Sequence, residues 1–509
     1  MIFYITTPIY YVNSTPHIGH AYTTIAADVV ARHHRQRGEE TFFLTGTDEN
    51  GTKIAQAAEA EGLDPRTFVD KMAAVWRELP TRVNASNDFF IRTTDDGHRA
   101  VVEEFVQRIY DAGEIYEGTY RGLYCVACEA FYAEAELVDG RCPQHGTVPE
   151  FFEERNYFFR LSSYQDALLR LYDENPEFVL PRVRYNEARR FIEQGLDDIS
   201  ISRGGQRWGI PVPWDPKQVI YVWVDALINY VSALDYAVEG EDLRPRLWPH
   251  VRHFLAKDIL KFHCVIWPAL LLAAGYQVPR QLFVHGYLLI DDRKISKSLG
   301  NVIDPLDLVS VYGIDPVRFF LLRITPFGQD GSASIDGLHE RYERELANEL
   351  GNLLSRTTAM IARYREGRLP GLQTAQVDSP FRATLDELGT EVASRLDRFD
   401  LSGALDDIWA VVRNLNRYVE ERAPWKLAKD ATKAAELDGT LYDLADGLRA
   451  VAVALAAYLP ETAPRILAAL GQSPDLGWRQ VGYGLTEPVG GIEPAAPLFP
   501  RVESPIASE

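Results

Sequence analysis

The stretch MIFYITTPIYYVNSTPHIGHAYTTIAADVVARHHRQRG, residues 1–38, places a strand, a turn and a helix in immediate succession. Ile2–Tyr11 is rich in β-branched and aromatic residues, which predicts a buried parallel strand. Pro16 fixes the chain at the start of a helix, which Ala21–Arg37 continues until Gly38 ends it. A strand that leads directly into a helix is typical of a doubly wound α/β sheet.

Two histidines, His17 and His20, lie three residues apart in the predicted first turn of this helix. Side chains at this spacing share one helix face, and the free N–H groups of a first turn favour an anion beside them. The pair therefore suits a polyphosphate, and Gly19, which lacks a Cβ, lets a flat ring such as adenine approach the backbone. A second interpretation stays open, in which the two histidines only cap a surface helix.

A second cluster, Lys294-Ile295-Ser296-Lys297-Ser298, follows an apolar strand predicted over Gln281–Ile290 and precedes Gly300. Two lysines and two hydroxyls on such a loop can clamp phosphates, whereas a solvated run of charges is the alternative. The chain has no G-x-x-x-x-G-K-[ST] phosphate loop. Together with the histidine turn, the lysine loop favours nucleotide chemistry.

The strand and helix patterns alternate from Met1 to about Tyr116. A strand at Thr41–Thr45, a helix from Lys53 and a strand at Phe89–Arg92 follow the first helix. This order predicts a doubly wound parallel sheet, which binds ligands at the carboxyl ends of its strands. Asp48 falls at such an end, where its carboxylate can hold an α-ammonium group or cap the next helix.

The composition bounds the class of protein. A chain of 509 residues with 46% hydrophobic and 25% charged residues predicts three or four globular domains. No apolar run reaches membrane-spanning length and no signal peptide is recognisable, so we expect a cytoplasmic protein that binds no membrane. The formal net charge of −20 argues against broad nucleic-acid affinity but leaves room for RNA on a local basic surface. Candidate residues for that surface are Arg341, Arg344, Arg356, Arg363, Arg365 and Arg368.

Three of the four cysteines belong to a pattern with the spacing of a zinc knuckle. The set is Cys125, Cys128, Cys142 and His145, as C-x2-C, thirteen residues, then C-x2-H. Gly140 and Pro143 favour the tight turn that a knuckle needs. Because four protein ligands leave no position for water, we expect one structural Zn²⁺, with empty reduced cysteines as the alternative. Cys264 is predicted to be a buried apolar residue.

The histidine turn and the lysine loop together resemble the signature pair of class I aminoacyl-tRNA synthetases. The surrounding residues resemble the methionyl-tRNA synthetase family in its bacterial form with a single zinc knuckle, over nearly the full length. The resemblance implies that ATP, with Mg²⁺, activates L-methionine to methionyl-adenylate and releases pyrophosphate. The methionyl group would then pass to the 3′ end of initiator and elongator methionine tRNA, and AMP would leave.

The resemblance also implies roles for individual residues. Charge stabilisation on the departing pyrophosphate is implied for His17, His20, Lys294 and Lys297, and ATP binding for His17, Gly19, His20, Asp258 and Lys297. The implied methionine pocket consists of Ile9, Tyr11, Asp48, Trp223, Ala226, Leu227, Tyr230, Ile259 and His263. Anticodon binding is implied for Asn348, Asn352, Arg356, Pro424 and Trp425. Arg203 is the implied partner of Asp48, whereas without the resemblance it would be a surface residue. Likewise, a polar helix face and a buried tryptophan are the alternatives at the anticodon positions.

Three alternative functions remain: another adenylate-forming ligase, a noncatalytic tRNA-binding protein, and a synthetase for a different amino acid. The pocket residues Trp223, Tyr230 and His263 favour methionine over other amino acids. The family usually has glycine where Ala256 stands and often proline where Leu227 stands.

The predicted domain organisation is a catalytic sheet with an insertion, followed by a helical bundle. The expected ranges are 1–116 and 220–290 for the catalytic halves, 117–219 for the zinc-bearing insertion, 291–340 for the lysine loop and stem-contact segment, 341–475 for the anticodon-binding bundle and 476–509 for the tail. The sheet is expected to resume over Val219–Tyr230. Antiparallel bundle helices are predicted at Arg341–Arg365, Ser379–Arg398, Leu401–Glu421 and Ala434–Tyr458. The tail from Gly490 is expected to be an extended strap or disordered, and the lack of an appended dimerising domain predicts a monomer.

Overall fold

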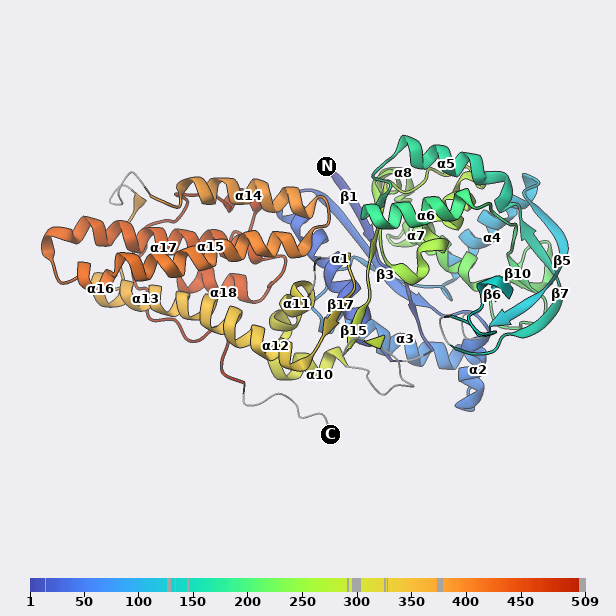
Figure 1. Cartoon of the computed structure of the whole chain (residues 1–509), viewed down its shortest axis with the longest axis horizontal. Coiled ribbons are helices and arrows are strands. Elements are labelled where there is room, and N and C mark those ends of the chain that lie inside the picture. Colours follow the sequence, from blue (N-terminus) through green and yellow to red (C-terminus); the bar gives the residue numbers. More distant parts are fainter. Residues whose placement is uncertain are drawn as a thin grey trace.

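A computed structural model describes residues 1–13, 15–125, 130–132, 134–143, 146–290, 293–294, 304–324, 326, 328–372 and 379–502. A rounded part built around a parallel sheet lies beside an elongated bundle of helices (Figure 1). The first helix lies close to the boundary between the two parts, with its start in the sheet region. The α/β class with a C-terminal helical bundle is therefore confirmed.

The central sheet has seven parallel strands in the order β2-β3-β1-β13-β14-β8, with β4 also paired to β3. The strands are β1 (Ile2–Thr6), β2 (Tyr10–Tyr11), β3 (Glu40–Asp48), β4 (Phe89–Arg92), β8 (Val179–Leu180), β13 (Val251–Ala256) and β14 (Gln281–His285). The strand predicted over Ile2–Tyr11 is broken around Pro8, which has no N–H for the ladder. Beyond the break, β2 continues to pair with the far end of β3.

The two faces of the sheet are covered by different helices. Phe3 and Ile5 of β1 belong to the core that they share with α1 (Ile18–Gln36). Tyr4, between them, belongs to the core on the other face with α7 (Val222–Tyr236). Because alternate side chains of a strand point to opposite faces, α1 and α7 lie on opposite sides of the sheet.

The prediction that the sheet resumes over Val219–Tyr230 is wrong. Strand β12 (Asp215–Ile220) ends at Ile220 and belongs to a small antiparallel sheet with β10 (Ser202–Arg203) and β11 (Pro211–Val212). The remainder of the segment is α7, most of whose residues are buried. A helix that is apolar on nearly all sides has no amphipathic period, so the pattern does not distinguish it from a buried strand.

The prediction of a single strand over Gln281–Ile290 is also wrong, because this segment is divided between two sheets. Its first half is β14, whereas β15 (Leu288–Ile290) belongs to another sheet with β16 (Arg293–Lys294) and β17 (Gly331–Ala333). The break falls at Gly286, where a Cβ would lie 2.3 Å from the carbonyl carbon of Gln329. Only glycine permits this close approach of two backbones.

The insertion after β4 and α4 (Asp96–Asp111) forms its own antiparallel sheet. Its strands are β5 (Ile115–Cys125), β6 (Ala130–Tyr132), β7 (Glu150–Phe159) and β9 (Ile199–Ser200), in the order β6-β5-β7-β9. Two helices, α5 (Gln165–Glu174) and α6 (Arg182–Glu193), follow β7, and β8 between them adds a strand to the central sheet. The insertion is therefore tied to the edge of the catalytic sheet.

The four predicted bundle helices are confirmed with small shifts in their ends. The first is a continuous run of α12 (Ile335–Arg341), a π-helix η7 (Tyr342–Gly351) and α13 (Asn352–Arg365). The others are α14 (Arg382–Leu396), α15 (Leu401–Arg422) and α17 (Ala434–Leu455). Helix α11 (Ile314–Arg323) precedes these bundle helices. A fully buried ion pair between its Arg318 and Asp28 connects it to α1, the helix that covers one face of the sheet.

The described part of the tail is an extended strap. Residues 484–502 form no helix or strand, and Leu498 and Phe499 are buried against the bundle. The hydroxyl of Tyr342 donates to the carbonyl oxygen of Pro500 at 2.5 Å. Residues 503–509 lie outside the described residues. Within the described ranges, no helix combines the length and the apolar character that crossing a membrane requires.

Candidate active site

His17 and His20 cap α1 reciprocally. His17 is the N-cap, and its Nδ1 accepts from the N–H of Gly19 at 3.1 Å. Nδ1 of His20 accepts from the N–H of His17 at 3.2 Å, and the ring centroids are 3.8 Å apart. Since Nδ1 is the acceptor in both rings, the proton of each neutral imidazole sits on Nε2. The two interpretations of the pair are compatible, because the cap uses one nitrogen of each ring.

His20 is held in its neutral form. Burial, together with the nearby His17, lowers the pKa of His20 well below its usual value of 6.5. Its ring lies edge-on to Trp76 of α3 (Pro65–Arg82) at 4.7 Å, and Tyr10 stacks on the same indole at 4.8 Å. His20 therefore offers an uncharged Nε2–H donor at the start of α1.

Gly19 makes room for the histidine cap itself. A Cβ at this position would lie 3.0 Å from Cε1 and 3.1 Å from Nδ1 of His17. Such contacts are tighter than ordinary van der Waals contact, so a side chain here would press the imidazole away from the N–H that it accepts from. Glycine between the histidines is thus explained by the cap as well as by the predicted approach of adenine.

A tyrosine and a histidine form the polar pair of the predicted methionine pocket. His263, on the π-helix η5 (Phe262–Ile266), directs Nδ1 at the carbonyl oxygen of Ile259 at 3.1 Å, so Nδ1 carries the proton. Nε2 therefore accepts from the hydroxyl of Tyr230 at 2.8 Å. Burial lowers the pKa of His263 to about 4, which keeps the ring neutral. A neutral pair of this kind suits a thioether better than a charged group does.

The other residues of the predicted pocket lie mainly on α7 and at the ends of β2 and β3. Trp223, Ala226, Leu227 and Tyr230 occur at positions i, i+3, i+4 and i+7, and therefore share one face of α7. Trp223 stacks on Phe262 at 4.0 Å. In the central sheet Tyr11 is paired with Asp48, with half-buried Ile9 just before β2. Burial, and to a lesser extent the charge of Asp48 at the end of β3, raises the pKa of Tyr230.

A buried polar network supports this site, and the sequence reasoning missed it. Asp225 of α7 accepts from Asn50 Nδ2 at 2.6 Å and lies 2.7 Å from Nε2 of His98. Nδ1 of His98 is 2.6 Å from the hydroxyl of Ser232. Asn50 is two residues beyond Asp48, so the network links the end of β3 directly to α7, and α7 in turn to α4. Asp225 within an apolar run was the one available signal, because a buried carboxylate needs partners.

The sequence pattern also predicts no role for two further buried histidines, His253 and His285. Nε2 of His253 accepts from the indole N–H of Trp267 at 3.1 Å, so its Nδ1–H donates to the hydroxyl of Thr6 at 2.8 Å. His285, at the carboxyl end of β14, directs Nδ1 at the carbonyl of Gly286 at 2.7 Å and Nε2 at the hydroxyl of Thr23 at 2.9 Å. Both lie on central strands, where side chains from neighbouring strand ends converge.

Arg203 is not a surface residue. Its side chain is 4% exposed, donates to the carbonyl of Ser202 at 2.7 Å and lies over the ring of Tyr221 at 4.0 Å. The alternative of an exposed arginine is therefore wrong, while its pairing with Asp48 stays a prediction. Asp258 is exposed in the turn Lys257–Ile259. Ala256 has φ −84° and ψ 158°, extended values that any residue adopts, so its methyl group causes no backbone strain.

The lysine loop is described only at its beginning. The backbone of Lys294 pairs with Leu289 across β15 and β16. The side chain of Lys294 and the whole of Lys297 lie outside the described residues. Their predicted phosphate contacts therefore stay predictions.

Half of the predicted zinc ligands are described, and they fit a metal site. Cys125 and Cys142 are both buried. Sγ of Cys125 is 3.2 Å from the hydroxyl of Thr147, whose carbonyl accepts from the N–H of Cys142 at 2.8 Å, so the two cysteines approach one another. Cys128 and His145 lie outside the described residues, and within the described ones no three metal-ligating side chains cluster.

The predicted anticodon residues lie toward the far end of the bundle. Asn352 donates to Asn348 at 3.2 Å, and Arg356 pairs with Glu420 at 2.5 Å. Pro424 is buried, whereas Trp425 is 36% exposed, so the alternative of a buried tryptophan is wrong. An exposed indole can stack on unpaired bases, and amide and guanidinium groups can hydrogen-bond to them.

Comparison with known proteins shows the family of this chain. The family model described as tRNA synthetases class I (M) matches residues 3–148 and 136–358. Methionine–tRNA ligase of Caldanaerobacter subterraneus subsp. tengcongensis is 44% identical over 98% of this chain and 79% of its own length. The Streptomyces coelicolor enzyme of the same name is 43% identical over 98% of this chain and 97% of its own.

A solved structure shares the fold. Methionyl-tRNA synthetase of Mycobacterium tuberculosis in complex with methionyl-adenylate superposes with a TM-score of 0.94 at 41% identity, covering 98% of this chain and all of that one. At these identities the agreement extends over both the sheet and the bundle. The chain that carries the histidine cap and the Tyr230–His263 pair therefore belongs to the methionyl-tRNA synthetases, the methionine-specific family of class I aminoacyl-tRNA ligases.

Proposed function

We propose that this chain activates L-methionine with ATP and transfers it to methionine tRNA through the site at the carboxyl ends of β1 and β3. In the first step a methionine carboxylate oxygen bonds to the α-phosphorus of ATP, and the bond from that phosphorus to the bridging oxygen of pyrophosphate breaks. In the second, a hydroxyl of the terminal tRNA adenosine takes the methionyl group and AMP leaves. The chain needs no covalent nucleophile, so its residues act by positioning and charge stabilisation.

The phosphate side of the site is assigned to the start of α1. Nε2–H groups of His17 and His20 donate to phosphate oxygens, and the helix dipole adds to their effect. Lys294 and Lys297 supply positive charge as pyrophosphate departs, while Mg²⁺ accompanies ATP. Asp258 is assigned to the nucleoside.

The methionine side is assigned to α7 and its neighbours. Asp48 holds the α-ammonium group, and the side chain enters between Trp223 and the Tyr230–His263 pair. The observation that carries the proposal is this pair, in which the hydroxyl of Tyr230 donates to Nε2 of His263 at 2.8 Å and Nδ1 of His263 donates to the carbonyl of Ile259. If His263 carried its proton on Nε2 instead, the lone pair of Nδ1 would face the lone pairs of the carbonyl oxygen of Ile259.

The partners follow from the same reading. We assign the CAU anticodon to Asn348, Asn352, Arg356, Pro424 and Trp425, and one structural Zn²⁺ to Cys125, Cys128, Cys142 and His145. The metal would stiffen the insertion and take no part in the chemistry. Metal analysis of purified protein tests this, since a zinc content near zero would remove the assignment. A cytoplasmic monomer is our further expectation, which light scattering tests for the oligomeric state.

The decisive experiment is ATP–pyrophosphate exchange with a panel of amino acids and no tRNA. We expect methionine alone to support exchange. Lys297→Ala should slow adenylate formation far more than it weakens methionine binding, because the lysine acts on charge that develops in the transition state. Exchange with another amino acid, or no exchange at all, would contradict the proposal.

A further inference from the structure

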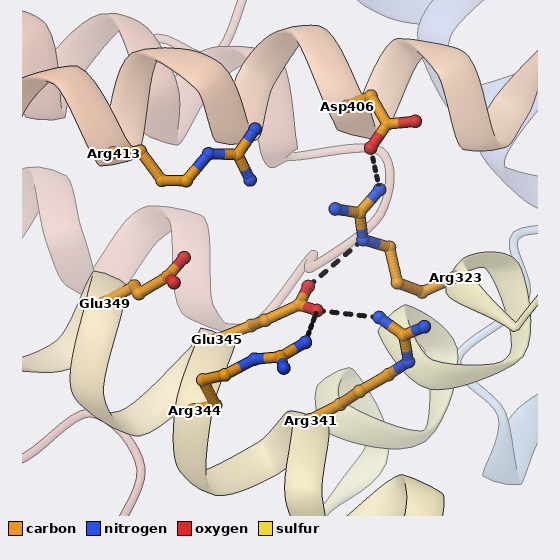
Figure 2. Close-up of a pocket in the computed structure, with 7 residues that line it drawn as sticks. All are labelled: Arg323, Arg341, Arg344, Glu345, Glu349, Asp406 and Arg413. Atoms are coloured by element: carbon orange, nitrogen blue, oxygen red, sulfur yellow. Dashed lines mark hydrogen bonds and ion pairs between the residues drawn. The ribbon is translucent and has the colours of Figure 1, made fainter.

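A cavity of about 530 Å³ opens where α11, α12, η7 and α15 meet. Figure 2 shows its lining, which consists of four arginines and three carboxylates. The arginines are Arg323, Arg341, Arg344 and Arg413. Their formal charges exceed those of the carboxylates by one, in a chain whose net charge is −20. We call this the arginine cavity.

One buried carboxylate organises three of the arginines. Glu345 is 4% exposed and accepts from Arg323 Nε at 3.0 Å. It also accepts from Arg341 at 2.6 Å and from Arg344 at 3.2 Å, as the dashed lines in Figure 2 show. Three guanidinium groups are thus held close together by this carboxylate, while Arg344 also pairs with Glu340 at 3.1 Å and Arg323 with Asp406. Their planes are fixed before any ligand arrives, which lowers the entropic cost of binding an anion.

The fourth arginine faces this group without a counter-charge of its own. Arg413 extends from α15 toward the space beside Arg323 (Figure 2) and is exposed. No ion pair or hydrogen bond of its side chain is found among the residues that the structure describes. The other two carboxylates are already engaged, because Asp406 pairs with Arg323 and Glu349 accepts from the indole of Trp409 at 2.8 Å. An anion in the cavity would relieve the repulsion between Arg413 and its neighbours.

The cavity lies at one end of a seam that leads to the predicted anticodon residues. On α15, Asp406, Arg413 and Glu420 are seven residues apart and therefore share one helix face. Glu420 pairs with Arg356 of α13, and Asn416 donates to the carbonyl of Glu349 on η7 at 2.8 Å. Helix α15 therefore runs beside the continuous helix formed by η7 and α13.

The spacing along the seam points to a polymeric ligand. Arg344 and Arg356 are twelve residues apart, which is about 18 Å of helix. A free anion would fill only the cavity, whereas several nucleotides of an RNA backbone would span the distance. Planar guanidinium groups match phosphate oxygens in pairs, and phosphate contacts of this type position an RNA without reading its bases.

We propose that the arginine cavity binds a backbone phosphodiester of the tRNA, next to the anticodon and on the side toward the catalytic sheet. This inference rests on the proposed function, because it takes methionine tRNA as the ligand. It assigns Arg413 as a direct phosphate contact and Glu345 as the residue that positions the other arginines. The contact would hold the anticodon stem while Trp425 and its neighbours read the loop.

The test compares Arg413→Ala with Arg465→Ala, an exposed arginine on α18 (Thr462–Ala469) of the same bundle. Affinity of the full chain for methionine tRNA is measured over a range of KCl concentrations. For Arg413→Ala we expect about an eightfold loss at 0.1 M salt and a salt slope shallower by about 0.9, the value of one lost phosphate contact. Arg413→Glu should lose more, and Arg465→Ala should match the unaltered protein.

Two readouts separate this role from others. The loss in Arg413→Ala should be the same on a tRNA whose CAU anticodon is replaced, because a phosphate carries no sequence information. Methionine-dependent pyrophosphate exchange should be unchanged, since Arg413 is remote from the sheet. Unchanged tRNA affinity in Arg413→Ala, or lost binding of inorganic phosphate with tRNA affinity intact, overturns the inference. Absence of exchange in the unaltered protein would instead overturn the proposed function, and the RNA comparison would still be readable.

Discussion

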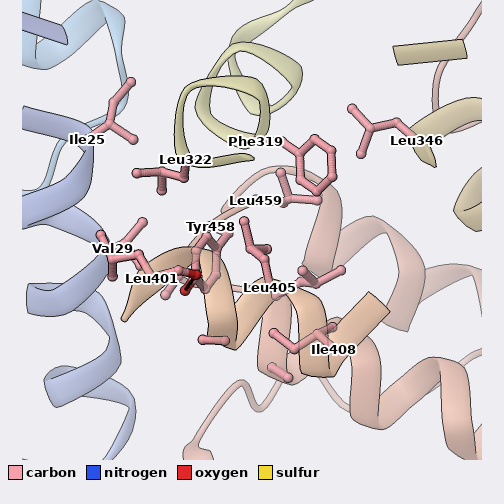
Figure 3. Close-up of a cluster of buried hydrophobic side chains, with 14 of the residues drawn as sticks. Ile25, Val29, Phe319, Leu322, Leu346, Leu401, Leu405, Ile408, Tyr458 and Leu459 are labelled. Atoms are coloured by element: carbon pink, nitrogen blue, oxygen red, sulfur yellow. Dashed lines mark hydrogen bonds between the residues drawn. The ribbon is translucent and has the colours of Figure 1, made fainter. Parts of the chain in front are cut away.

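Replacing Arg318 with methionine should weaken the whole molecule, because this side chain connects the sheet to the bundle. Its guanidinium is fully buried and donates to Asp28 at 2.6 Å. It also donates to the carbonyls of Val83, Asn84, Ala457 and Tyr458 at 2.8 to 3.2 Å. Around it, side chains of α1, α11 and α15 form one core, in which Ile25, Phe319 and Leu405 are members (Figure 3).

The expected cost follows from these contacts. Removing one partner of a buried ion pair costs about 3–5 kcal/mol. Asp28 keeps Arg32 at 2.8 Å and the N–H of Ser86 at 2.6 Å, and the carbonyl of Asn84 keeps Arg32 as its donor, which softens the loss, but the other three carbonyls lose the guanidinium. We therefore expect about 4 kcal/mol. For a cooperative unfolding unit of 509 residues, a loss of about 4 kcal/mol in unfolding free energy lowers Tm by about 4 °C.

Calorimetry of Arg318→Met and of the control Arg32→Met gives the measurement. Arg32 pairs with the same carboxylate, but its side chain is 23% exposed, so water replaces much of what it loses. We expect its Tm to fall by about a quarter as much. If Arg318→Met is no less stable than Arg32→Met, the buried pair does not join the two parts as we argue.

Three other substitutions or conditions test the site and its surroundings. Tyr230→Phe removes the hydroxyl that donates to His263, so KM for methionine in pyrophosphate exchange should rise by about tenfold, with an unchanged KM being the contrary result. Gly19→Ala should press His17 off its cap and lower kcat for exchange by about tenfold or more while methionine affinity is kept, and equal losses in both would speak against this geometry. Burial lowers the pKa of His33 to about 3 and of His263 to about 4, below the unfolded value of 6.5. Above pH 6.5 neither group affects stability, whereas on acidification only the unfolded chain takes up these protons, so each histidine costs about 2 kcal/mol at pH 5. Tm should therefore fall between pH 6.5 and 5, less steeply in His33→Gln, and a Tm that is level over this range would refute the argument.

Local patterns predicted several parts of this molecule well. The strand, turn and helix of residues 1–38, the position of His17 and His20 in the first turn, and the four amphipathic bundle helices depend on neighbours within a few residues. Such features follow from chain stiffness and from the period of apolar side chains. The resemblance carried by the histidine turn and the lysine loop pointed to the family that the comparisons then showed.

Other features were decided only when distant segments packed together. The sequence around Val222–Tyr236 is equally apolar as a helix or as a strand, and its place between α4 and the sheet makes it a helix. The same holds for Asp225, His98 and Asn50, whose contacts cross more than 100 residues of chain. No local spacing encodes these partners, because their pairing depends on burial that only the folded core creates. The sequence by itself determined the locally encoded elements and the family, while the tertiary structure decided the form of α7 and the division of β14 from β15, the proton positions of the buried histidines, the network that joins β3 to α7 and the arrangement of the arginines around Glu345.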